Sequence, residues 1–420
     1  MTAAGSPTVF EPRWMSDLYV EHVEEIEFLW SQRADLLQSH EIRAHDLREH
    51  DERIEAHVQA LLVPGLDVVP VIEHFLEEDD PGLVFAAAYP LLRLRDGAIA
   101  ERIVSLYERA EGDRRKGFVD AFTHGPISQV QSKLERHYSP ESPMTALATV
   151  RIMAFHDPKL FRPDVISGTA RNDNVDVRAL AWRTAKYGSG LSEATVKQGL
   201  QDPDPGVRAH AATAAAWGRY PGVLDHLRDA VRSATPEAFS AARLLAIVGD
   251  ESDWPRLRPF AQDPQFGPDR FSVPASLGHP DAVDIILEGL ADDDPAAAEC
   301  AARAFRRITG VDVLTGDRAQ PTMADCTDDF DVEFAPEYFI PDIERAREEW
   351  EKRKPSFMEG RRWCHGMEVT RDIDHDTLER VDVLSRAELC LRSAFVGKPI
   401  LSAVDLEQFP QIRASSSSKT

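Results

Sequence analysis

The chain has 420 residues, of which 43% are hydrophobic and 29% are charged, and 72 acidic against 48 basic side chains give a formal net charge of −24. That length supports a large core divided into two or three structural regions. A surface this acidic repels DNA, RNA and anionic lipid, so it argues against nucleic-acid or membrane partners and favours a basic protein partner.

The ends of the chain and its cysteines predict a cytoplasmic protein. Residues 1–14 contain no apolar signal segment and are expected to be disordered, and no apolar run reaches membrane-spanning length. The four cysteines lie far apart and form no CxxC pair, which is typical of reduced thiols. They are Cys300, Cys326, Cys364 and Cys390.

Residues 15–65 have the periodicity of two amphipathic helices. Apolar residues recur on one face of each helix. They are Val20, Val23 and Phe28 in the first helix, and Leu47, Ile54, Val58 and Leu61 in the second. We expect this pair to cap the first repeat of the region that follows, because an uncapped repeat array exposes apolar surface at its end.

Residues 66–315 contain an internal repeat. The segment 206–218, GVRAHAATAAAWG, matches 176–188, DVRALAWRTAKYG, and similar helix ends recur every 29 to 32 residues. These ends fall at Asp96, Gly125, His156, Gly188, Gly218, Gly249, Gly278 and Gly310. A period held over so many intervals predicts a repeat architecture.

Proline pairs mark the starts of the repeated helices. A residue that can cap free amides precedes a proline whose backbone suits the first helical position. The pairs begin at Asp80, Ser142, Asp204, Thr235 and Asp294. Between the repeated helices lie second helices with apolar residues at i, i+3 and i+4, as at Val223, Leu227 and Val231. Each unit is therefore a helical hairpin. The predicted fold is an all-α, right-handed α-solenoid with a period of about 31 residues.

The remaining chain is predicted to form an acidic linker (316–337), a smaller C-terminal helical region (338–413) and a disordered tail (414–420). Within the linker, residues 324–337 carry six acidic residues and no basic one. Such runs are usually solvated.

The Asp-Pro-x-Val-Arg start, spaced alanines and closing glycine resemble the second helix of a HEAT repeat. In that family an aspartate in the loop and the Val-Arg arginine form a ladder between units, which implies roles for Asp204, Arg208 and Arg178. Residues 21–33, 47–65, 85–92 and 357–366 resemble, in order, the motifs of an uncharacterised bacterial HEAT-repeat family. Its members are often encoded near type VI secretion spike and effector genes, and no biochemical activity is established for it.

The repeated helices, such as 176–188 and 206–218, resemble the second helices of HEAT repeats, and in HEAT solenoids those helices line the concave face, where partners bind. Trp182 and Arg183 fall where the neighbouring unit has Ala212 and Thr213, so we expect both to project into the groove. Aromatic residues and arginines are typical of binding hot spots. The predicted partner-binding residues are Trp182, Arg183, Lys186, Trp217, Arg219 and Tyr220. For Trp217, which directly precedes the closing glycine, the pattern fits a core role as well as a binding role.

No catalytic, cofactor or metal site is predicted. His45, His50 and His57 lack the i, i+4 spacing of a zinc site, and the adjacent pair Cys364-His365 has no evident orienting third group. The chain has no nucleophile-elbow, phosphate-loop or dinucleotide-binding motif.

These patterns favour a non-enzymatic protein-interaction scaffold. The resemblance implies an adaptor or immunity protein for a type VI secretion effector, with a secretion component or toxin as partner and no cofactor. The alternative is a HEAT-like enzyme or nucleic-acid-binding protein, similar to DNA glycosylases or bilin lyases. Glycosylases of that kind need a basic groove, and this chain is short of cations.

Overall fold

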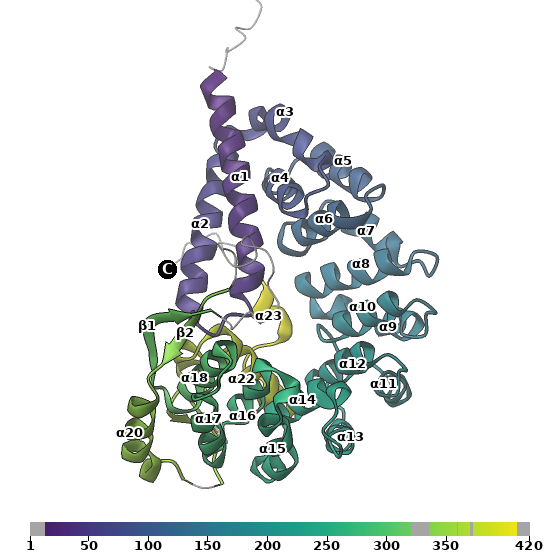
Figure 1. The fold of residues 1–420 in the computed structure, drawn as a ribbon. Coiled ribbons are helices and arrows are strands. Elements are labelled where there is room, and N and C mark those ends of the chain that lie inside the picture. Colours follow the sequence, from purple (N-terminus) through teal and green to yellow (C-terminus); the bar gives the residue numbers. More distant parts are fainter. Residues whose placement is uncertain (1–12, 321–335, 359, 370–372, 410–420) are drawn as a thin grey trace, which may run out of the picture. The chain divides into compact units, whose positions relative to one another are not determined.

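The computed structural model describes residues 13–320, 336–358, 360–369 and 373–409 (Figure 1). It is an all-α solenoid of helical hairpins with two short two-stranded sheets. The chain divides into two compact units. One comprises residues 1–38, 45–169 and 407–420, and the other comprises 39–44 and 170–406.

The first unit contains two long N-terminal helices followed by short hairpins. Its helices are α1 (Arg13–Leu36), α2 (Ala44–Leu62), α3 (Val69–Ile72), α4 (Pro81–Arg93), α5 (Gly97–Tyr107), α6 (Gly112–His124), α7 (Gln131–Leu134), α8 (Pro143–His156) and α9 (Pro163–Thr169).

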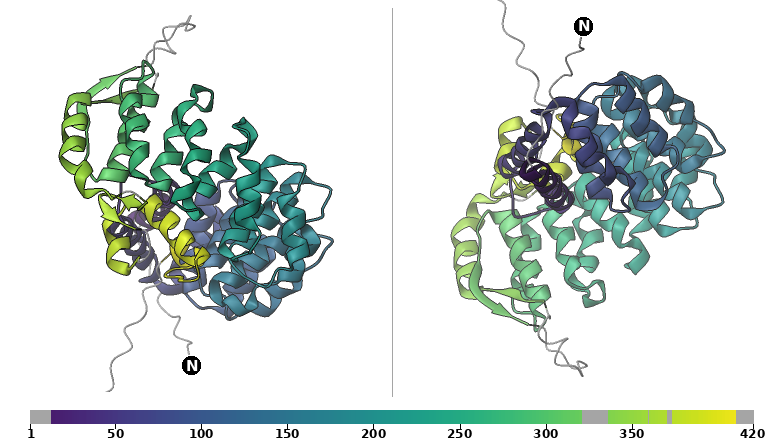
Figure 2. Two further views of the ribbon diagram at one scale, coloured as in Figure 1. Left: turned by 90° about the horizontal axis from the view of Figure 1, so that it is seen from below. Right: turned by 90° about the horizontal axis from the view of Figure 1, so that it is seen from above.

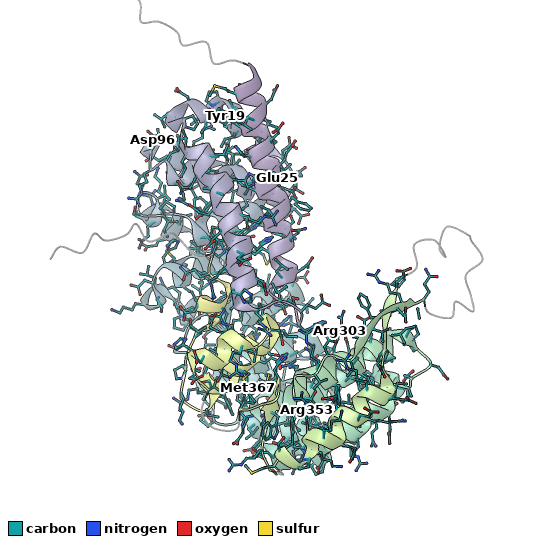
Figure 3. The ribbon with its side chains drawn as sticks, turned by 90° about the vertical axis from the view of Figure 1, so that its left-hand side faces the viewer. Tyr19, Glu25, Asp96, Arg303, Arg353 and Met367 are labelled. Carbon is teal, nitrogen blue, oxygen red and sulfur yellow. The ribbon has the colours of Figure 1, made fainter. Side chains whose placement is uncertain are left out.

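The long helix α1 packs against α4, and α4 packs in turn against α6. On α1, Tyr19 is buried whereas Glu25 is exposed (Figure 3). Phe28, predicted to share the apolar face of this helix with Val23, is 54% exposed, whereas Val23 is buried. A buried ion pair at 2.7 Å, from Arg33 Nε to Asp51 Oδ1, joins α1 to α2.

The second unit continues the hairpins as α10 (Val175–Ala185), α11 (Glu193–Leu200), α12 (Pro205–Trp217), α13 (Val223–Ala230), α14 (Phe239–Val248), α15 (Trp254–Gln262), α16 (Ser272–Leu277), α17 (Val283–Gly289) and α18 (Pro295–Thr309). Its inner helices pack in succession, α10 on α12, α12 on α14, α14 on α16 and α16 on α18. The other helices of this series lie outside them (Figure 2).

The predicted proline-containing helix starts are observed, but only some are capped by a side chain. The carboxylates of Asp80, Asp204 and Asp294 accept hydrogen bonds from backbone amides in the first helical turn. Ser142 and Thr235 make no such bond, so the prediction that they act as caps is wrong.

The arginine ladder differs from the one that the HEAT resemblance implies. Arg178 Nε donates to Asp202 Oδ2 at 2.8 Å, while Asp204 serves as the helix cap. Arg208 donates to the carbonyls of Asp202 and Pro203. Arg270 pairs with Asp292 in the same manner at 2.5 Å, two residues before Asp294. The acidic member is therefore the first aspartate of the loop, because the second is committed to the cap.

Glycines on outer helices make room for two large rings, one on the inner helix α10 and one directly before the inner helix α16. A Cβ at Gly199 of α11 would lie 2.1 Å from Cζ2 of Trp182, and a Cβ at Gly289 of α17 would lie 2.2 Å from Cζ of Phe271. Both are closer than van der Waals contact allows. The close packing of α11 against Trp182 and of α17 against Phe271 therefore depends on glycine at these two positions.

The C-terminal part combines short strands with helices, whereas the sequence predicted helices alone. Its elements are β1 (Leu314–Ala319), β2 (Tyr338–Pro341), α20 (Ile343–Arg353), β3 (Trp363–Cys364), β4 (Met367–Glu368), α21 (His375–Arg380), α22 (Val383–Phe395) and α23 (Ala403–Glu407). Strands β1 and β2 pair antiparallel, as do β3 and β4. Most of the predicted acidic linker and the whole predicted tail (414–420) lie outside the described residues. So does the predicted disordered N-terminus (1–14), apart from Arg13 and Trp14, which begin α1.

Candidate functional site

Trp182 belongs to the core of the second unit. Its side chain is 0% exposed and lies against Gly199 of the outer helix α11. The prediction that Trp182 projects into a groove is therefore wrong. The equivalent residue Ala212 is also buried, at 4% exposed, so this position faces the core in both repeats.

Next to Trp182, three basic side chains gather where α10 and α12 pack together. Arg183 is exposed, and Lys186 lies with its Nζ 5.0 Å from the ring centre of Tyr187. Burial lowers the pKa of His210 on α12, and the charges of Arg183 and Lys186 lower it further. Arg183, Lys186 and His210 thus form a basic cluster on two successive repeats.

Trp217, Arg219 and Tyr220 make contacts within the unit. Trp217 is half-buried and packs against the apolar core formed by the C-terminal part, which includes Cys364, Val369 and Leu389. Arg219 is exposed in a left-handed conformation (φ +57°). Its guanidinium lies beside Gly397. Tyr220 is half-buried, and its hydroxyl donates to Glu193 at 3.5 Å.

The C-terminal part covers the inner helices around Trp217, because α22 packs against both α12 and α14. The predicted partner-binding residues therefore fall into two groups, one exposed and one in contact with the C-terminal part. Arg183 stays exposed, whereas Trp217 contributes to an internal contact.

The motif Arg361–Gly366 attaches the C-terminal part to the ends of the inner helices. Arg362 is 3% exposed and donates to the carbonyls of Ala246, Ile247, Gly249 and Ser276. The amides of Trp363, His365 and Gly366 donate to the carbonyls of Gly278, Arg307 and Ile308. The last carbonyls of a helix lack intrahelical partners. The motif supplies donors to the ends of α14, α16 and α18.

The Cys364-His365 pair is a structural element of this attachment. Burial raises the pKa of the Cys364 thiol to about 11, so the thiol is neutral at pH 7 and a poor nucleophile. His365 Nε2 donates to Asp382 Oδ2 at 2.6 Å, and Asp382 also accepts from the amide and hydroxyl of Ser385. These bonds hold the turn against the start of α22.

The N-terminal histidines also have structural partners. His50 Nε2 donates to the carbonyl of Leu29 at 2.8 Å, and His57 Nδ1 lies 3.0 Å from His22 Nδ1. Among the described residues, no group of three or more His, Cys, Asp or Glu side chains has the arrangement of a metal site.

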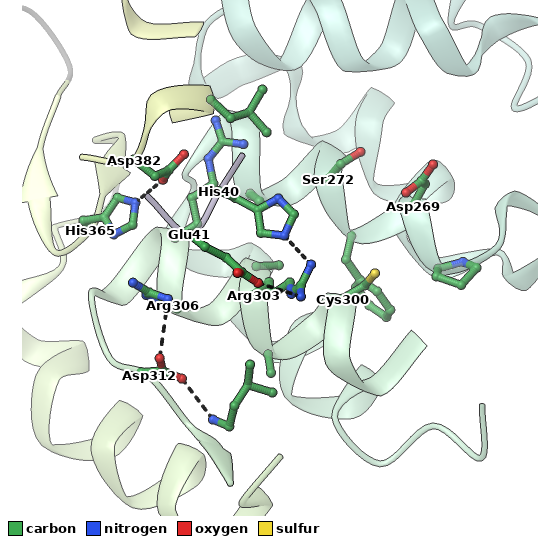
Figure 4. Close-up of a pocket in the computed structure, with 18 of the residues that line it drawn as sticks. His40, Glu41, Asp269, Ser272, Cys300, Arg303, Arg306, Asp312, His365 and Asp382 are labelled. Atoms are coloured by element: carbon green, nitrogen blue, oxygen red, sulfur yellow. Dashed lines mark hydrogen bonds and ion pairs between the residues drawn. The ribbon is translucent and has the colours of Figure 1, made fainter. Parts of the chain in front are cut away.

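A cavity of about 260 Å³ lies on the inner side of α14, α16 and α18, within the second unit (Figure 4). The segment 39–44 and the C-terminal part complete its wall through His40, Glu41, His365 and Asp382. These residues come from distant parts of the chain, and the repeat pattern gave no sign that they meet.

Most charges around the cavity are paired. Arg303 contacts Glu41 at 2.9 Å and Glu299 at 2.6 Å, and its Nη1 also donates to His40 Nε2. Arg306 contacts Asp312 at 3.4 Å. Arg307 pairs with Glu388.

The fold and these sites define an all-α solenoid of helical repeats. Residues 162–247 match the HEAT repeats family. A crystal structure of an engineered protein from the Northeast Structural Genomics Consortium is similar at 15% identity. The similarity covers 70% of this chain and 87% of that chain, with a TM-score of 0.31. No curated protein matches the sequence.

Across the described ranges, no single helix has both the length and the apolar character to cross a membrane. Residues Ala44–Leu62 and Gly65–Glu77 meet those criteria only as a joined pair, which is bent by 103°.

Proposed function

We propose that the chain is a non-enzymatic scaffold that binds another protein through the basic cluster of Arg183, Lys186 and His210. The observation that carries this proposal is the state of Arg183. This side chain is exposed on an inner helix and has no ion pair or hydrogen bond with any residue of the described chain. Arginines are among the residues that contribute most to protein interfaces.

The chemistry of the cluster specifies the partner's contact surface. Two cations and an imidazole favour a carboxylate, because an arginine can bind both oxygens of that group. The surrounding chain has a net charge of −24, which attracts a partner that is basic elsewhere. The proposed partner is therefore a basic protein with an acidic side chain at the centre of its interface.

The resemblance to the family encoded near type VI secretion genes supports a finer proposal. As an adaptor, the protein would hold an effector for loading onto the secretion spike. As an immunity protein, it would block a toxin, and its negative charge would suit a basic nuclease. An immunity gene should rescue cells that express the neighbouring toxin, whereas an adaptor gene should be needed only for export.

Calorimetric titration with the purified product of the adjacent gene tests the scaffold. We expect the double variant Arg183→Ala/Lys186→Ala to lose about 2 kcal/mol or more of binding free energy, roughly a thirtyfold weakening. Its melting temperature should change by only a few degrees, because alanine favours the helix. Lys197→Ala, exposed on the outer helix α11, is the control. Equal affinities of both variants and the wild type would rule out this binding face.

A further inference from the structure

We propose that the cavity on the inner side of α14, α16 and α18 binds a small organic anion. This site is separate from the protein-binding face proposed above. The proposal rests on unpaired hydrogen-bond donors, on the pairing of the nearby carboxylates, and on the size and apolar lining of the cavity.

The first observation is an arginine without a counter-charge. Arg243 extends from α14 into the cavity lining, and it makes no ion pair or hydrogen bond with the described residues. Its Nε is fully buried. Burying a guanidinium donor without an acceptor costs free energy, so a cavity that contains one favours an anionic ligand.

Neighbouring side chains add donors. The Oγ atom of Ser272, at the start of α16, is buried and has no partner within the described residues. His40 accepts a hydrogen bond at Nε2 from Arg303, so its ring proton is on Nδ1. Burial and the charge of Arg303 lower the pKa of His40, which is consistent with a neutral ring.

The carboxylates of the lining do not replace such a ligand. Glu41, Asp312 and Asp382 are engaged by Arg303, Arg306 and His365, respectively. Asp269 also lines the cavity, but it is exposed, so water and salt screen its charge. Arg243 is thus the cation that remains available to a ligand.

The size and the apolar lining exclude a bare inorganic ion as the preferred ligand. A cavity of about 260 Å³ is several times the volume of one water molecule, which is roughly 30 Å³. Phe271, Ala275 and Leu314 supply apolar surface. Apolar walls with a few converging polar groups are typical of small-molecule sites. The ligand class is therefore an organic carboxylate, sulfonate or phosphate ester with an apolar body.

The test compares two fluorescent probes that differ chiefly by one anionic group. The first is 8-anilinonaphthalene-1-sulfonate, and the second is its uncharged counterpart, N-phenyl-1-naphthylamine. We expect the full chain to bind the sulfonate about tenfold more tightly, as one charge-assisted hydrogen-bonded contact predicts. Arg243→Gln should remove this preference and leave the affinity for the uncharged amine unchanged. Arg258→Gln, exposed on α15 and outside the cavity lining, should behave as the wild type.

Three results would overturn the proposal. They are equal affinity of the wild type for both probes, equal weakening of both probes by Arg243→Gln, and the same loss in Arg258→Gln. If circular dichroism shows that Arg243→Gln does not fold, competition on the wild type decides. Inorganic phosphate should then displace the sulfonate more strongly than sodium chloride of the same ionic strength does, and failure to do so would also overturn the proposal.

Discussion

Trp182 shows how a core residue can resemble a binding residue in the sequence. We expect Trp182→Ala to lower the free energy of unfolding by about 3 to 5 kcal/mol, because the truncation leaves a cavity that its neighbours fill only in part. Urea denaturation of the full chain measures this loss. Arg183→Ala, the exposed neighbour, should change stability by less than about 0.5 kcal/mol. Similar losses in both variants would contradict the assigned burial of Trp182.

The fit of Trp182 depends on Gly199. Adding one methyl group in Gly199→Ala should cost about 1 to 3 kcal/mol of unfolding free energy, because the new Cβ would meet the indole and the Cβ of Ala211. Gly168→Ala is the matched control. A Cβ added to that helical glycine would have no neighbouring atom within 4 Å, so alanine there should be neutral or stabilising. Thermal melts of the two variants check the difference.

The contact between Trp182 and Gly199 explains why the sequence pattern predicted the repeat correctly but the orientation of Trp182 wrongly. Aligning the units on Arg178 and Arg208 set the register of α10 and α12 correctly. The orientation of Trp182 depended on a glycine in another helix, Gly199, which an alignment of inner helices does not include. Trp182 stands where the next unit has Ala212, so the side-chain volume at this position differs between the two units. The glycine at 199 compensates for the larger ring, as Gly289 does for Phe271, and this pairing of a large ring with a glycine indicates a core residue.

At the scale of elements, Arg362 links the β3–β4 hairpin to the repeats through four side-chain hydrogen bonds. We expect Arg362→Met to increase amide hydrogen exchange in β3 and β4 and in the last turns of α14 and α16, because four carbonyls lose their donor. Arg361→Met is the control, since Arg361 is half-buried and pairs with Glu368 of the same hairpin at 3.2 Å. Unchanged exchange in Arg362→Met would show that the hairpin is held by other contacts.

The start of α22 has a predictable pH dependence. Burial alone would raise the pKa of Asp382, but the hydrogen bond from His365, the charge of Arg307 and the donors of Ser385 together lower it below its usual range. Since the folded-state pKa lies below the unfolded value of about 3.9, the carboxylate stabilises the fold above that pH. This stabilisation is lost as the pH falls through the folded-state pKa.

We therefore expect Asp382→Asn to be less stable than the wild type at pH 7, and the difference to shrink below about pH 4. Urea midpoints measured across this range give the comparison. Asp376→Asn, exposed on α21, should follow the wild type at every pH. A difference between Asp382→Asn and the wild type that stays constant down to about pH 2 would show that the carboxylate's charge is not responsible.

The elements of the C-terminal part were predictable only in outline. Its helices follow from apolar periodicity, but β1–β2 and β3–β4 are short and depend on tertiary partners. For β3, those partners include the carbonyl of Gly278, and the turn after it donates from His365 to the carbonyl of Arg307. Propensity cannot find strands of two residues that are fixed by bonds to helix ends. The same cause hid the cavity, because His40, Arg243 and His365 come together only through the fold.

For the whole molecule, the repeat period predicted the all-α solenoid, and the structure confirms it. The period carries this information because each hairpin must bury its apolar face on the next, so the same small and apolar residues recur at fixed intervals. The residues that we propose for binding do not recur at this interval. The basic cluster and the cavity each depend on a few side chains, among them Arg183 and Arg243, which depart from the residues at equivalent positions.

The net charge makes a prediction that separates the scaffold from its nucleic-acid-binding alternative. Affinity for DNA depends on cations that replace counterions on the phosphates. The chain has 72 acidic and 48 basic side chains, and the basic cluster contributes only two of these cations, Arg183 and Lys186. We expect no detectable shift of a labelled duplex at physiological salt in a gel mobility assay. A band that is retarded at low salt should disappear as salt is added, because salt weakens the contacts between exposed cations and phosphates.

Sub-micromolar binding that persists at physiological salt would mean that the cations act together on one face. Loss of that binding in Arg183→Ala/Lys186→Ala, with Lys197→Ala unaffected, would then identify the basic cluster as a phosphate-binding surface instead of a protein-binding one.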